Sequence, residues 1–219
     1  MTSLSIQAVI FDMDGVLIDS EPLWQRIEYD VLSALGVPVT IETIQQTTGL
    51  RIDQCVDYWY HKAPWPEYDN AKVSQMIIDK VANEILISGE AMQGVNEAIN
   101  YCQALGLKIG LATSSPTTII DAVLTKLELR EQFMAIESAE KLRYGKPHPE
   151  VYLNCAKTLG VDPRYCLAIE DSFNGLIAAR AANMQTVAIP ATEQKDEAKW
   201  VIAHHQADTL LALPKVLTA

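Results

Sequence analysis

The sequence lacks an excess of positive charge. Lysine and arginine together number 17, against 28 aspartate and glutamate residues, and the formal net charge is −11. A surface that binds nucleic acid requires a clear basic excess, so we expect no nucleic acid partner. A local basic site for a single phosphate group is compatible with this composition. Long apolar runs are also missing: none approaches the ~20 residues needed to cross a bilayer, and we expect no membrane-spanning segment and no membrane partner.

Cysteine is scarce, and its spacing is irregular. The four cysteines form no CxxC pair and have no companion histidine pattern of the kind seen at zinc sites. This favours free thiols in a reducing compartment over disulfides or zinc ligands. The N-terminus also lacks the basic segment and apolar core of a secretory signal. We therefore expect a cytoplasmic protein, with a monomer as the default state.

Short apolar runs with β-forming residues alternate with segments of helical periodicity. The predicted strands lie at 8–11, 108–112, 134–136, 166–169 and 186–189, and the predicted helices at 95–105, 117–127, 150–159 and 173–182. Gly106 and Gly160 follow two of these helices at the position where glycine commonly ends one. The alternation indicates βαβ units and a parallel sheet covered on both faces. The sequence thus predicts an α/β protein with a Rossmann-like core.

One stretch departs from this alternation. From residue 18 to about residue 88 there are helical patterns and no convincing strand, and the APWPEYDN segment has the composition of a loop between two helices. Tyr58, Trp59 and Tyr60 are expected chiefly to pack these helices together. We predict that residues 1–17 and 89–219 form the α/β core, and that 18–88 is a helical domain inserted after the first strand.

Polar residues gather where the predicted strands end, and in an open parallel sheet ligands bind beyond the carboxyl ends of the strands. The residues at these places, together with one lysine from the loop before the helix at 150, are Asp12, Asp14, Gly15, Thr113, Ser114, Ser115, Lys146, Glu170 and Asp171. Clustered carboxylates repel one another unless a cation neutralises them. Because only oxygen ligands are available here, the cluster favours Mg²⁺.

The same residue types are suited to phosphoryl transfer. A carboxylate such as Asp12 can attack phosphorus, and a second acid two residues on can move protons. Lys146 and Thr113 can compensate the charge on the transferring group. Ser115 and Pro116 have the pattern of an N-cap and a first helical residue, so a helix start, a favourable anion site, is predicted there. Each pattern alone is more often structural, but the four together, in this order, indicate phosphoryl-transfer chemistry.

Four stretches of the sequence resemble the motifs of the haloacid dehalogenase-like hydrolases: DMDGVLIDSE, LATSS, KPHP and IEDS. The spacing resembles the subfamily that carries a helical cap after the first motif and includes β-phosphoglucomutase and sugar-phosphate phosphatases. The resemblance covers nearly the whole chain. Some stretches, such as GLRID and KPHPEVYL, look especially like bacterial 2-deoxyglucose-6-phosphate and hexitol phosphatases. The resemblance implies a phosphatase that acts on small sugar or polyol phosphates with Mg²⁺.

The resemblance also implies catalytic roles, carried over motif by motif. Asp12 would be the nucleophile that forms an aspartyl-phosphate, and Asp14 the general acid and base. Thr113 and the amide of Ser114 would bind phosphate, and Lys146 would stabilise its charge.

The metal-binding and cap residues follow in the same way. Asp12, the backbone carbonyl of Asp14 and Asp171 would hold Mg²⁺, with Glu170 adjacent or contributing through water. Gly15 would let the backbone turn tightly beside the metal. In the predicted cap, Arg51 is a candidate substrate contact because TTGLRID resembles the loop that reaches toward the substrate. Trp24 lies close to the first motif and is a second candidate.

Two other functions remain open at this point. A phosphosugar mutase would share the core chemistry, but mutases of the β-phosphoglucomutase type resemble DTAxxH after the first motif. This chain has DSEPLW instead, with Trp24 in place of the histidine. A phospho-accepting signalling receiver also uses an acidic Mg²⁺ cluster, but its acceptor ends a middle strand, it lacks the second Asp of DxD, and it needs only about half this length.

Overall fold

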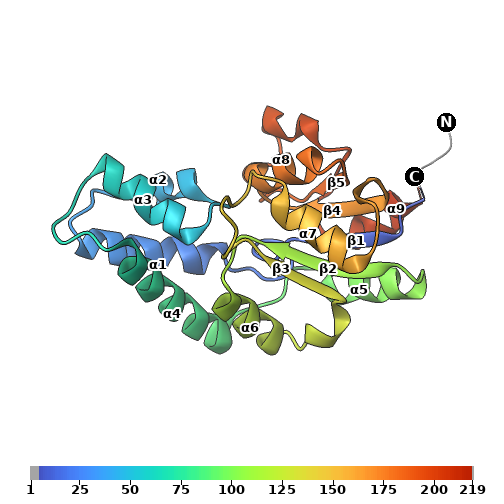
Figure 1. The fold of residues 1–219 in the computed structure, drawn as a ribbon, viewed down its shortest axis with the longest axis horizontal. Coiled ribbons are helices and arrows are strands. Elements are labelled where there is room, and N and C mark those ends of the chain that lie inside the picture. Colours follow the sequence, from blue (N-terminus) through green and yellow to red (C-terminus); the bar gives the residue numbers. More distant parts are fainter. Residues whose placement is uncertain (1–4, 219) are drawn as a thin grey trace.

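The computed structural model describes residues 5–218. It contains a parallel sheet, and a group of helices lies beyond the carboxyl ends of the central strands (Figure 1). The sheet order is β3-β2-β1-β4-β5-β6, and every pairing is parallel. The strands are β1 (Ala8–Phe11), β2 (Lys108–Thr113), β3 (Ala135–Ser138), β4 (Cys166–Glu170), β5 (Gln185–Ala188) and β6 (His205–Gln206). The predicted α/β fold with a parallel sheet is confirmed.

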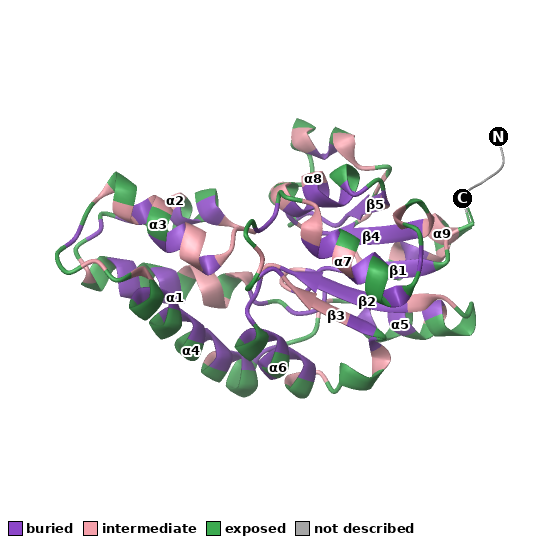
Figure 2. Ribbon diagram, viewed as in Figure 1, coloured by how far each residue is buried: buried purple, intermediate pink, exposed green. Residues whose placement is uncertain are grey.

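Both faces of the sheet are buried, which explains why its strands are apolar throughout. Alternate residues of β1 point to opposite faces: Val9 and Phe11 belong to one hydrophobic core, whereas Ala8 and Ile10 belong to another. The helices α5 (Val95–Ala104) and α6 (Thr117–Lys126) contribute to the first core, and α7 (Glu150–Leu159) and α8 (Phe173–Ala181) to the second. Figure 2 shows the buried central strands between these layers.

The predicted helices of the core begin and end within one residue of the observed ones. Gly106 and Gly160 follow α5 and α7 in the left-handed conformation, with φ of 67° and 65°, as expected for residues that end a helix. The sequence did not predict β6, which has only two residues, or the short C-terminal α9 (Leu213–Leu217). Residues 5–218 also contain five short 3₁₀ segments, at Gln45–Thr47, Arg130–Gln132, Pro163–Tyr165, Ala198–Ile202 and Leu210–Ala212.

Between β1 and β2 the chain forms helices only, as far as its regular elements are concerned. Before α5 these are α1 (Glu21–Ala34), α2 (Ile41–Ile44), α3 (Ile52–Lys62) and α4 (Asn70–Ser88), with the short 3₁₀ segment Gln45–Thr47 between α2 and α3. All four lie within the stretch 18–88 assigned to an insertion, although its status as a separate domain stays a prediction. Aromatic rings pack inside it as expected, with Tyr60 stacked on Tyr68 and Trp65 edge-on to both. No helix within residues 5–218 combines the length and apolarity needed to cross a bilayer.

The helical segment is tied to the sheet where the chain leaves and returns. Ile18 forms isolated bridges with Asp14 on one side and Ala91 on the other, so both connections run close together. Further away, α4 packs against α1 and also against α6 of the sheet region. The helices therefore lie over the carboxyl ends of the central strands (Figure 1), which is the edge at which the sequence places its polar residues.

Gly110 provides a direct test of how tightly α7 packs on the sheet. A Cβ atom at this position of β2 would lie 2.5 Å from Cys155 Sγ and 3.1 Å from Leu159 Cδ1. We predict that Gly110→Ala lowers the free energy of unfolding by about 1–3 kcal/mol, the usual effect of overpacking, as measured by urea denaturation. Adding Cys155→Ala removes the closest obstacle and should recover part of this loss. Strictly additive effects of the two substitutions would contradict the described packing.

Candidate active site

Asp12 lies directly beyond the end of β1, where the chain must turn. Its backbone N–H still donates to Ile169 of β4 (3.0 Å), and the side chain is only 6% exposed. Three residues later Gly15 has φ of 72°, a conformation that costs glycine little. A Cβ atom at Gly15 would overlap the carboxylate of Asp171. Glycine is therefore required both by the turn and by the close approach of the second acidic side chain.

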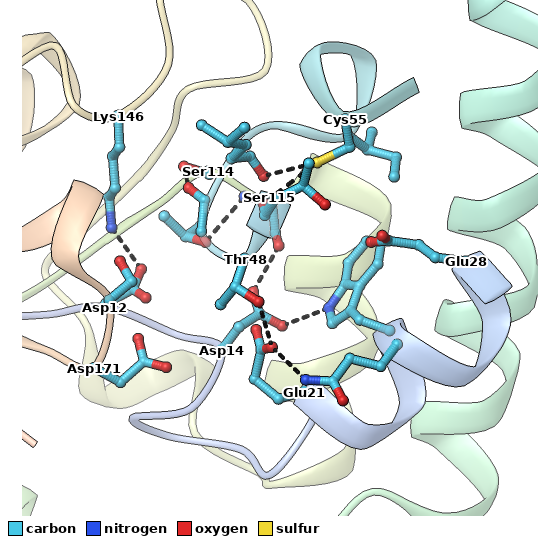
Figure 3. A pocket seen from close by; sticks show the side chains of 18 of the residues that line it. Asp12, Asp14, Glu21, Glu28, Thr48, Cys55, Ser114, Ser115, Lys146 and Asp171 are labelled. Atoms are coloured by element: carbon cyan, nitrogen blue, oxygen red, sulfur yellow. Dashed lines mark hydrogen bonds and ion pairs between the residues drawn. The ribbon is translucent and has the colours of Figure 1, made fainter. Parts of the chain in front are cut away.

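Lys146 lies at the centre of the buried polar cluster. Its ammonium group donates to Asp12 Oδ1 (2.7 Å), Glu170 Oε1 (2.6 Å) and the backbone carbonyl of Ala112 (3.0 Å), and the side chain is 2% exposed. Figure 3 shows it extending toward Asp12. Glu170 accepts a further hydrogen bond from the hydroxyl of Tyr152, which is completely buried. The ammonium group of Lys146 thus joins the ends of β1, β2 and β4 to the loop before α7.

The cluster contains more acid than base, and its pKa values reflect this. Burial raises the pKa of Asp12 to about 8; the charges of Glu170 and Asp14 add to the effect and Lys146 opposes it. Burial, with the charges of Asp12 and Glu170, also raises the pKa of Asp171 well above its usual value. For Lys146, burial favours the neutral form, but Asp12 and Glu170 outweigh it and raise the pKa of the ammonium. The site can therefore accommodate a further positive charge.

The arrangement of the acids fits a metal ion. Oxygen atoms of Asp12, Glu170 and Asp171 lie within 4.8 Å of one another, and a set made only of carboxylate oxygens suits a hard cation such as Mg²⁺. Glu170 is already occupied by Lys146, Tyr152 and the hydroxyl of Ser172. This leaves Asp12 and Asp171 as the carboxylates best placed to bind the ion directly. That the carbonyl of Asp14 takes part stays a prediction.

Asp14 is held by hydroxyl and indole groups from two parts of the chain. Its Oδ1 accepts from Ser20 Oγ (2.6 Å) and Trp24 Nε1 (2.9 Å), and its Oδ2 accepts from Ser115 Oγ (2.6 Å). Ser20 and Trp24 belong to the start of the helical segment, whereas Ser115 follows β2. The prediction that Ser115 caps a helix is wrong, because α6 begins at Thr117 with Pro116 at the N-cap position and no side-chain cap.

The other hydroxyl residues after β2 lie where predicted. Thr113 is buried, and its Oγ1 accepts from the backbone N–H of Ser115 (3.0 Å). Ser114 Oγ donates to the carbonyl of Gly49 (3.3 Å), in the loop before α3. Thr113, Ser114 and Lys146 line one common pocket with the three site aspartates, Asp12, Asp14 and Asp171. Their predicted roles toward phosphate stay predictions.

The pocket lies between the strand ends and the helical segment (Figure 3). Trp24 lines it, so the structure brings this predicted substrate contact to the site, although its indole N–H is directed to Asp14. Arg51 is different. Its guanidinium donates to the carbonyls of Ala139 (2.9 Å) and Leu142 (2.6 Å) and pairs with Asp53. It fastens the helical segment to the loop after β3 rather than lining the pocket, so its contact with substrate stays a prediction that this geometry does not support.

The sequence pattern of the haloacid dehalogenase-like hydrolases matches residues 9–189, most of the chain. The protein belongs to this family. The matched range includes the acids at the ends of β1 and β4, the hydroxyls at the end of β2 and Lys146, which the structure brings together at the carboxyl ends of the strands.

Several relatives within the family are similar over most of their length. Hexitol phosphatase B of Escherichia coli K12 is 45% identical over 213 residues, which cover 97% of this chain and 96% of that protein. Fructose-1-phosphate phosphatase YqaB of the same organism is 30% identical over 182 residues, with 82% and 94% covered. Among solved structures, a β-phosphoglucomutase from Clostridium difficile superposes with a TM-score of 0.84 at 23% identity, covering 97% of each chain. That last similarity establishes the fold alone.

Tyr152 is a site residue that the sequence did not predict, because a tyrosine on the buried face of a helix looks like any core residue. We predict that Tyr152→Phe lowers the free energy of unfolding by about 1–3 kcal/mol, since a buried, charged acceptor loses a donor. Thermal or urea denaturation measures this effect. Tyr165→Phe, at a partly exposed position, serves as the matched control. Equal stability of the two variants would show that the Tyr152–Glu170 contact contributes nothing.

Proposed function

We propose that this protein is a Mg²⁺-dependent phosphatase that hydrolyses small sugar or hexitol phosphates through an aspartyl-phosphate on Asp12. The observation that carries the proposal is the placement of Asp12 at a strand end, paired with the buried Lys146, with Asp14 held two residues further on. The names of the relatives, a hexitol phosphatase and a fructose-1-phosphate phosphatase, support this substrate class.

In the first half of the reaction a carboxylate oxygen of Asp12 attacks phosphorus, and the bond from phosphorus to the sugar oxygen breaks. Asp14 gives its proton to the leaving oxygen, so the sugar departs as a neutral alcohol. Three donors to Asp14, from Ser20, Trp24 and Ser115, keep its carboxyl group in a fixed orientation for this transfer. Lys146 compensates the negative charge that Asp12 carries and that the phosphoryl group brings.

In the second half a water molecule attacks the phosphorus of the aspartyl-phosphate. Asp14, now ionised, takes a proton from this water, and the bond between phosphorus and Asp12 breaks. Inorganic phosphate leaves, and both aspartates return to their starting states. Mg²⁺, held by Asp12 and Asp171, would neutralise phosphate charge throughout.

The helical segment 18–88 acts as a cap in this proposal. It covers the pocket with side chains from α1 and from the loop before α3, and a closed cap excludes bulk water from the phosphorylated aspartate. The proposal also places the protein in the cytoplasm, because all four cysteines are free and buried, as is common in a reducing compartment. A monomer is its default oligomeric state.

Phosphate release from a panel of phosphorylated compounds tests the proposal. With Mg²⁺ present we expect release from hexose and hexitol phosphates, such as 2-deoxyglucose 6-phosphate and sorbitol 6-phosphate, and little release from a nucleotide. EDTA should abolish it, because the carboxylates of the site then lack their counter-charge. Conversion of glucose 1-phosphate to the 6-phosphate without release of phosphate would instead identify a mutase.

Substitutions that keep the shape of the side chain distinguish the catalytic roles of Asp12 and Asp14. Asp12→Asn should reduce turnover by at least 10⁴-fold, since the amide cannot attack phosphorus. Asp14→Asn should slow the hydrolysis of sorbitol 6-phosphate about 10²- to 10⁴-fold. It should slow the hydrolysis of 4-nitrophenyl phosphate less, because nitrophenolate leaves without a proton. Circular dichroism serves as the control for folding. Equal losses on both substrates would argue against general-acid catalysis by Asp14.

A further inference from the structure

Glu28 is an acidic residue of the pocket that no motif explains. On α1, Glu21, Gln25 and Glu28 follow one another at helical spacing, and all three line the pocket. Figure 3 shows Glu21 and Glu28 on this helix, with Asp12 and Lys146 on the opposite side of the view. The α1 face of the pocket is thus acidic, and it lies apart from the Lys146 cluster.

The carboxyl group of Glu28 has no partner among residues 5–218. Glu28 is 8% exposed as a whole residue, and its carboxyl group forms neither a hydrogen bond nor an ion pair. Its oxygen atoms can be reached from the pocket, because among the described residues only Trp59 Nε1 is fully enclosed without a partner. The nearby thiol of Cys55 is directed to the carbonyls of Thr47 and Leu50 instead. A largely buried carboxyl group without a protein donor costs free energy unless solvent or a ligand reaches it, and structural carboxylates normally have protein donors. A carboxyl group left in this state, inside a pocket, points to a ligand that supplies the donors.

The surroundings indicate which chemical class that ligand belongs to. Lys146 is the only lysine or arginine among the described residues that line the pocket, and it is already bound to Asp12 and Glu170. A second phosphate or a carboxylate near Glu28 would therefore lose its hydration without gaining a cation. Hydroxyl groups, which donate and accept, can bond to Glu28 and to the hydroxyl of Thr48 in the same pocket.

We propose that Glu28 is a specificity-determining residue that binds the hydroxyl groups at the uncharged end of a polyol or sugar phosphate. The inference rests on the proposed function, in which the phosphate end of the substrate lies at Asp12. Burial raises the pKa of Glu28 to about 8, with the charge of Glu21 adding to the effect. Near neutral pH its carboxyl group can therefore both donate to and accept from hydroxyls.

Three variants test this role. Glu28→Leu removes the polar group, Glu28→Gln retains a donor and an acceptor, and Asp30→Asn is a matched control on the exposed face of α1. We expect Glu28→Leu to lower kcat/KM for sorbitol 6-phosphate about 10- to 100-fold more than for 4-nitrophenyl phosphate, which has no polyol chain. Glu28→Gln should restore most of this difference, and Asp30→Asn should not create one.

Stability and a second substrate pair complete the test. Because an unpaired buried carboxyl group is removed, Glu28→Leu should raise Tm by a few degrees; a structural role would lower it. The unmodified enzyme should prefer sorbitol 6-phosphate at least tenfold over 6-phosphogluconate, which has a carboxylate at the far end. Equal losses on both phosphate esters in Glu28→Leu, a lowered Tm, or preference for 6-phosphogluconate would overturn the inference.

These results separate this inference from the proposed function. If the enzyme hydrolyses sorbitol 6-phosphate and Glu28→Leu loses no selectivity, only the role of Glu28 fails. If it hydrolyses 4-nitrophenyl phosphate but no sugar or polyol phosphate, the proposed substrate class fails, and the inference fails with it.

Discussion

The buried contact of Lys146 with Asp12 and Glu170 is the interaction on which the rest of the site depends. It joins the ends of β1 and β4 to the loop before α7 in a place almost closed to water. Removing one partner from such a cluster leaves an uncompensated buried charge, which commonly costs about 3–5 kcal/mol. The parallel sheet makes the cluster possible, because it brings strand ends distant in sequence to one edge. The same geometry leaves Asp12 and Asp171 facing one another, ready for a cation.

A second junction couples the helical segment to this chemistry. Asp14 accepts hydrogen bonds from Ser20 and Trp24 on one side and from Ser115 on the other. The orientation of its carboxyl group therefore depends on both regions being in contact. Arg51 provides a second connection between the helical segment and the sheet, through hydrogen bonds to the backbone carbonyls of the loop after β3. In the proposed mechanism, closure of the segment over the pocket and placement of the proton-transferring group are consequently one event.

The sequence predicts the sheet and its polar edge well, because buried strands are apolar on both faces and their ends change abruptly to acids and hydroxyls. Asp12, Thr113, Lys146 and Asp171 all occur where the chain order places them. Within the helical segment, Trp24 was predicted and lines the pocket, but the contacts of Arg51 could not be predicted, since its direction depends on a loop 88 residues away. Glu28 has ordinary helical spacing, and only the structure shows that it faces a cavity without a partner. The two residues of β6 are too few to form a pattern.

The central claim is that Asp12 becomes phosphorylated, and chemical trapping tests it most directly. Borohydride reduces an acyl phosphate to an alcohol, so an aspartyl-phosphate formed during turnover would be converted to homoserine. The enzyme would be mixed with sorbitol 6-phosphate and Mg²⁺, treated with borohydride, digested and examined by mass spectrometry. The account predicts homoserine at position 12 only when substrate is present. Turnover with an unmodified Asp12, or with homoserine at another aspartate, would contradict it.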